Sequence, residues 1–101
     1  MVAPFDKSDY MPVLVTGFEA LTVDGSATAF TPATADRAIS AHVSVEGAQV
    51  RYRVGNNPTA SVGTVLNEGD EIVVWGKADI DAIRFIRTGG VSATLNTHFA
   101  R

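Results

Sequence analysis

Hydrophobic and polar positions alternate along much of this chain, which is the pattern of β-strands with one buried and one exposed face. Two alternating runs, residues 39–46 and 50–54, are separated by Gly47, and we predict a β-hairpin through residues 46–48. The cleanest run is the last one, in which polar residues separate Val91, Ala93, Leu95, Thr97 and Phe99.

Shorter segments complete the pattern. Residues 82–88 form a predicted strand with Ile83 and Phe85 on one face and Arg84 and Ile86 on the other. Residues 32–37 suit a single helical turn in which Thr34 or Asp36 is a plausible cap, and residues 64–66 are too short to assign. The other predicted strands are residues 18–23, 27–31 and 70–76, with glycine at most junctions.

About seven or eight short antiparallel strands spaced by roughly ten residues predict an all-β fold, a single small β-sandwich or jelly-roll-like domain. We assign this domain to residues 13–101. Residues 1–12 show no periodicity and contain Pro4 and Pro12, so we predict an extended N-terminal arm there. The aromatic residues of this arm, Phe5 and Tyr10, are candidate contacts to other proteins.

Composition narrows the class of function. Of 101 residues, 46% are hydrophobic and 19% charged, as expected for one folded domain. The net charge of −3 argues against a general nucleic-acid binder, and the absence of cysteine excludes disulfides and thiolate chemistry. With neither a signal peptide nor an apolar run of about 18 residues, we expect a soluble protein made in the cytoplasm that does not bind membranes.

Residues suited to catalysis are few. His42, His98 and Glu46 could in principle form a metal site of a cupin-like enzyme, but they lack an H-x-H spacing, and we expect the histidines to face solvent. Paired carboxylates such as Asp79 and Asp81 lie in turn-like sequence, and neither a G-x-S-x-G motif nor a phosphate-binding glycine loop occurs. We therefore predict no catalytic residue, cofactor or metal ligand, and no enzymatic activity.

Candidate interface residues lie in the predicted strands. Arg51, Arg53, Arg84 and Arg87 either line ordinary solvated faces or form ion pairs between subunits, for which the guanidinium fork is suited.

Trp75 is a further candidate interface residue. It shares its face with Val73, opposite two apolar residues, so a second subunit would cover one face of this strand. Alternatively, Trp75 forms a sugar-stacking platform with Asn56 and Asn57, whereas Tyr52 is assigned to the core.

Five short segments follow one another along the chain in an order that can be compared with known proteins. They are FEALTVD (residues 18–24), AQVRYRV (48–54), NPTASVG (57–63), LNEGD (66–70) and IRFIRTG (83–89), the last followed by Ala93-Thr94-Leu95. Across residues 18–99 this order resembles small structural proteins of tailed bacteriophages. The resemblance implies a virion component on a β-sandwich or jelly-roll scaffold, without enzymatic activity and without catalytic residues.

Among virion roles, we expect a capsid decoration (cement) protein, because such proteins are small, β-rich and commonly trimeric. Its partners would be the major capsid protein or other virion proteins. It would be located on the surface of the capsid. The arm could add a strand to a neighbour's sheet. The alternatives are a neck, tail or fibre-associated phage protein and a carbohydrate-binding module. The cupin-like metalloenzyme is the alternative that the sequence favours least.

Overall fold

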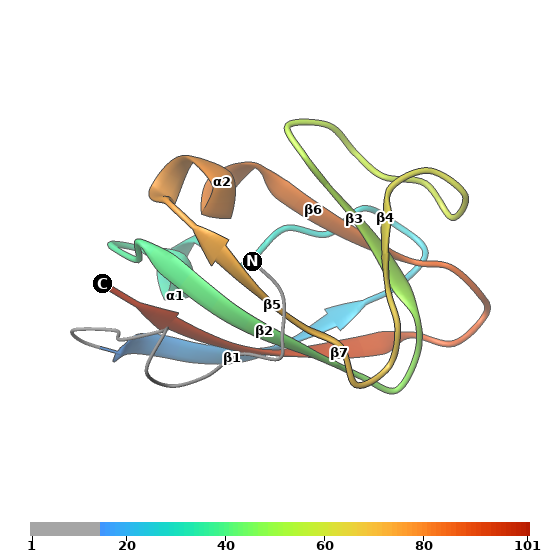
Figure 1. The fold of residues 1–101 in the computed structure, drawn as a ribbon, viewed down its shortest axis with the longest axis horizontal. Coiled ribbons are helices and arrows are strands. Elements are labelled where there is room, and N and C mark those ends of the chain that lie inside the picture. Colours follow the sequence, from blue (N-terminus) through green and yellow to red (C-terminus); the bar gives the residue numbers. More distant parts are fainter. Residues whose placement is uncertain (1–14) are drawn as a thin grey trace.

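The computed structural model describes residues 15–101, which form a sandwich of two antiparallel β-sheets (Figure 1). The predicted all-β sandwich is therefore confirmed, while the predicted arm with Phe5 and Tyr10 lies outside the described residues. No helix within residues 15–101 has the length and apolar character to span a bilayer. The elements are β1 (Val15–Val23), α1 (Pro32–Ala35), β2 (Ser40–Glu46), β3 (Val50–Val54), β4 (Thr64–Leu66), β5 (Glu71–Trp75), α2 (Lys77–Ala82), β6 (Ile83–Arg87) and β7 (Ala93–Ala100).

One sheet has four strands in the order β1-β7-β2-β5, and the other has three in the order β4-β3-β6. The predicted hairpin between β2 and β3 is therefore wrong, since these consecutive strands belong to different sheets. Val43 and Val45 of β2 and Val50 of β3 are all buried in the same core. The two strands consequently face each other across the sandwich, and the turn at Gly47, which has a φ of 93°, joins the two layers.

Two other expectations differ from the structure. Residues 27–31 form no strand: Thr28 makes one isolated bridge to Phe85, and Phe30 is buried with 3% of its surface exposed. Residues 79–81 belong to α2 and not to a turn, because Ile80 packs into the core with 1% exposed. In both segments, burial of one large apolar side chain decides the local structure.

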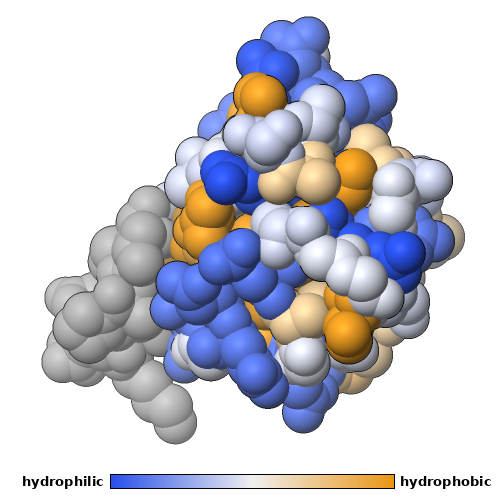
Figure 2. Space-filling view, turned by 90° about the vertical axis from the view of Figure 1, so that its right-hand side faces the viewer, coloured by the Kyte–Doolittle hydropathy of each residue, from blue (hydrophilic) through white to orange (hydrophobic). Residues whose placement is uncertain are grey.

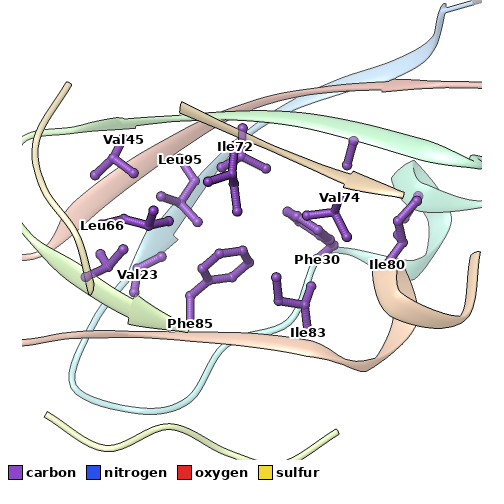
Figure 3. Packing of buried hydrophobic residues seen from close by; sticks show 14 of the residues in the cluster. Val23, Phe30, Val45, Leu66, Ile72, Val74, Ile80, Ile83, Phe85 and Leu95 are labelled. Carbon is purple, nitrogen blue, oxygen red and sulfur yellow. The ribbon is translucent and has the colours of Figure 1, made fainter. Parts of the chain in front are cut away.

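The core lies between the sheets, where side chains from both layers point toward one another (Figure 3). Phe85 of β6 is fully buried, and its ring centroid lies 5.4 Å from that of Phe30 and 6.2 Å from that of Tyr52. Phe30 also meets Phe99 of β7 edge-on at 5.1 Å. This chain of rings connects the three-stranded sheet to the four-stranded one.

Replacement of Phe85 by alanine should lower the free energy of unfolding by about 3–5 kcal/mol, because it removes a fully buried ring and leaves a cavity between the sheets. Denaturation by guanidinium chloride measures this loss. Phe18→Ala is the matched control, since that ring is 51% exposed and its removal should change stability by less than about 1 kcal/mol. Equal losses in the two variants would contradict this description of the core.

Candidate functional site

The outer side of the four-stranded sheet carries a row of residues that the register brings together. Phe18 of β1 pairs with His98 of β7, which pairs with His42 of β2, which pairs with Val73 of β5. Directly opposed residues of antiparallel strands point to the same side of the sheet. Trp75, two residues beyond Val73, points to this side as well. We call Phe18, His42, Val73, Trp75 and His98 the aromatic face.

Two large side chains of the aromatic face are strongly exposed. Phe18 is 51% exposed and Trp75 is 49% exposed, at opposite edges of the sheet. Val73 is only 6% exposed within the single chain, so its burial does not need the second subunit that the sequence suggested. Trp75, by contrast, is exposed enough to contact another protein, as expected of an interface residue.

The two histidines of the aromatic face have different neighbours. Nε2 of His42 lies 2.6 Å from Oε1 of Glu71, and this pair is partly buried. The exposed His98 ring packs against Phe18 at a centroid distance of 4.8 Å. Glu46, which the sequence grouped with both histidines, instead accepts a hydrogen bond from Nδ2 of Asn96 at 3.2 Å. Within residues 15–101, no three acidic or histidine side chains gather in a group that could hold a metal ion.

Arg51 binds the long loop between β3 and β4. Its Nε donates to the carbonyl oxygen of Ala60 at 3.1 Å, and its Nη1 donates to that of Gly63 at 2.7 Å. Pro58 of the same loop is buried. A Cβ at Gly63 would lie 2.9 Å from the carbonyl oxygen of Tyr52, so the loop returns close to the β3 backbone. Arg51 therefore fixes a loop of its own chain.

The other three candidate arginines also bind oxygen atoms of their own chain. Nη1 of Arg84 donates to the carbonyl oxygens of Asp81 at 2.7 Å and Ile83 at 2.8 Å. Nη1 of Arg53 is 3.5 Å from the carbonyl oxygen of Asn57, and Nη1 of Arg87 is 3.0 Å from Oγ of Ser92.

None of these four arginines takes part in the ion pairs of the described chain. Those pairs are Lys77–Asp81 and, when the ring of His42 is protonated, His42–Glu71. A neutral carbonyl or hydroxyl oxygen satisfies a guanidinium donor but does not cancel its charge. The four guanidinium groups therefore keep their positive charge available for a partner, and ion pairs between subunits stay a prediction.

Trp75 borders a groove of about 200 Å³ between β5 and β3. Asp79 is the acidic residue among the residues that line it. Asn56 and Asn57, which the sequence grouped with Trp75, line a separate hollow of about 210 Å³ together with Gly55, Ala82 and Arg84. The groove is lined by Tyr52, Val54, Ile72, Val73, Val74, Trp75, Asp79 and Ile83.

Phe18 and Asp79 were not singled out as binding residues from the sequence. Phe18 lies in a run with apolar residues on both faces, Phe18 and Ala20 on one and Leu21 and Val23 on the other, so the pattern there does not tell which face is covered. The sequence pattern predicts a turn at Asp79, whereas the structure has this residue in α2, and Asp79 and Trp75 both line the groove. The strand register is the information that sequence alone lacked.

Comparisons of the chain with protein-family models, with curated proteins and with solved structures find no match.

Replacement of Arg51 by methionine should loosen the β3–β4 loop, because the apolar stem is kept while both donors to the loop carbonyls are lost. We expect a loss of about 1–3 kcal/mol in unfolding free energy and faster amide hydrogen exchange in residues 57–63. Arg101→Met, at an exposed position next to β7, is the control. Unchanged exchange in the loop of the Arg51 variant would contradict the assigned role.

Proposed function

We propose that this chain is a non-enzymatic structural protein of a bacteriophage particle, which binds the outer surface of the capsid as an oligomer and so decorates the shell. The observation that carries the binding role is the aromatic face, with Phe18 and Trp75 each about half exposed. The proposal of a capsid as the partner is supported by the resemblance of the ordered segments to phage structural proteins.

The aromatic face has the composition of a protein-binding surface. Aromatic residues are enriched in interfaces, and tryptophan is a frequent energetic anchor. Covering a half-exposed ring gives a modest gain, since full burial of a large apolar side chain is worth roughly 1.5–3 kcal/mol. An oligomer that contacts a repeating shell multiplies such weak contacts through avidity. A small face with two aromatic anchors therefore suits attachment to a lattice.

Three of the five resembling segments lie on the layer opposite the aromatic face, whereas the first, residues 18–24, belongs to β1 and begins with Phe18 of the aromatic face itself. The segments at residues 48–54, 57–63 and 83–89 form β3, its following loop and β6, all in the three-stranded sheet or beside it. Residues 66–70 comprise the last residue of β4 and the β4–β5 turn. Arg51 and its loop partner Gly63 are both within these segments. The shared pattern thus describes mainly the three-stranded sheet, and of the proposed capsid contact it includes Phe18 alone.

Trp75→Ala and Phe18→Ala should each weaken capsid binding by on the order of tenfold, because each removes a side chain that would be buried on the shell. Cosedimentation with capsids assembled from the major capsid protein of the same genome measures the binding. Val62→Ala, at a loop residue that is 50% exposed, is the matched control and should bind normally. If both aromatic variants decorate capsids as well as the unchanged chain, the aromatic face is not the contact.

A carbohydrate-binding module is the second candidate, favoured by the position of Trp75 beside a groove that also contains Asp79. An exposed indole ring can stack on the apolar face of a sugar while a carboxylate accepts hydrogen bonds from its hydroxyl groups. On this reading, a glycan array shows binding that Trp75→Ala abolishes and Val62→Ala leaves intact. Absence of binding to any glycan by the unchanged chain would exclude this candidate.

A further inference from the structure

The outer side of the three-stranded sheet carries three arginines. The register places Arg53 of β3 directly opposite Arg84 of β6, and Arg51 lies two residues before Arg53 on the same side. Like charges directly opposite each other on neighbouring strands destabilise a sheet. We call Arg51, Arg53 and Arg84 the basic face. In a chain with a net charge of −3, this concentration of positive charge is a local exception.

The basic face adjoins a hollow that suits a carboxylate. The hollow has a volume of about 210 Å³ and is lined by Gly55, Asn56, Asn57, Ala82 and Arg84. Asparagine amides and a guanidinium supply N–H donors, and hydrogen bonds from a guanidinium to a carboxylate are stronger than those to neutral oxygens. The present acceptors of Arg84 are backbone carbonyls, so a carboxylate there would also balance its charge.

The complementary charge lies at another place on the same chain. Glu46, Glu68 and Asp70 surround the β2–β3 and β4–β5 turns, which lie side by side at the lower right of Figure 1. The amide N–H of Gly47 donates to Oε2 of Glu68 at 3.3 Å, and that of Asn67 donates to Oδ2 of Asp70 at 2.7 Å. These donors are neutral, so the carboxylates keep their charge. We call Glu46, Glu68 and Asp70 the acidic corner.

Arg53 and Arg84 of the basic face are too far from the acidic corner to be neutralised by it within one molecule. Val50 pairs with Leu66 at the end of β3 near the acidic corner, and Arg53 is three residues farther along β3. At about 3.3 Å per residue this separation is about 10 Å before the turn itself is counted. Exposed charges at such a distance are largely screened at about 0.15 M salt, where the Debye length is about 8 Å.

We propose that the acidic corner of one copy docks on the basic face of a second copy, with a glutamate side chain entering the hollow beside Arg84. A second copy is the occupant that the charges favour, since one chain carries both complementary surfaces, three carboxylates against three guanidinium groups. This contact joins unlike surfaces head to tail, and such contacts close into rings when the rotation between neighbours allows it. The inference deepens the proposed function by naming the surfaces that would build its oligomer.

The test is the sedimentation of the full chain by analytical ultracentrifugation at about 50 mM salt, where exposed charges are weakly screened. The unchanged chain should sediment as an oligomer that dissociates at about 1 M salt. Arg53→Glu should weaken association by at least about tenfold, while Arg101→Glu, the same charge change beside the other sheet, should not. Arg53→Glu sets a carboxylate opposite Arg84, a pairing that favours the fold.

A reciprocal variant keeps the test independent of folding. Glu46→Arg combined with Glu68→Arg should also dissociate the oligomer, and an equal mixture of this variant with Arg53→Glu should form heterodimers, because the unchanged acidic corner of one variant then meets the unchanged basic face of the other. A monomeric unchanged chain at low salt, or an oligomer that neither reversal affects, would overturn the inference. Trp75→Ala should leave the oligomer intact. An oligomer that forms in this way but binds no capsid would refute the proposed function alone.

Discussion

Contact between the aromatic rings of the two layers is the interaction on which the rest of this structure depends. Phe30 lies in a connecting segment, and its ring meets Phe85 of one sheet and Phe99 of the other. Because these rings and their aliphatic neighbours hold the inner faces together, each sheet turns its second face away from the core. The aromatic face and the basic face are those two outward surfaces. Their separation by a packed core means that each can contact a different partner.

The basic face shows how one residue type can serve stability and binding together. Each candidate arginine is held by an oxygen atom of the main chain or of a serine, which limits the positions its guanidinium group can take. A group already ordered loses less conformational entropy when a partner arrives. Figure 2 shows one end of the molecule, where hydrophobic residues are scattered singly among polar ones. Contacts to a partner at this end would therefore be mainly polar, with a few isolated hydrophobic side chains.

The sequence predicted the class of fold and most strands, because alternation reports directly which side of a strand is buried. Ile83 and Phe85 are buried and Arg84 and Ile86 are less so, as the pattern of that run indicated. Alternation does not report which strand lies beside which. The hairpin assigned between β2 and β3 was therefore wrong, and the row that joins Phe18 to His98 was not foreseen. Trp75 was identified because a tryptophan on a strand with apolar residues on both faces is conspicuous even without the register.

The pairing of β1 with β7 bears on how the chain acquires its structure. These are the first and last strands of the described region, and β7 lies between β1 and β2 and does not form an edge of the sheet. During synthesis, β1 is the first of the described strands to be made and its partner β7 is the last. Contacts between residues so distant in sequence slow folding. We therefore expect the closure of the four-stranded sheet, in which β7 joins β1 to β2, to be a late step of folding.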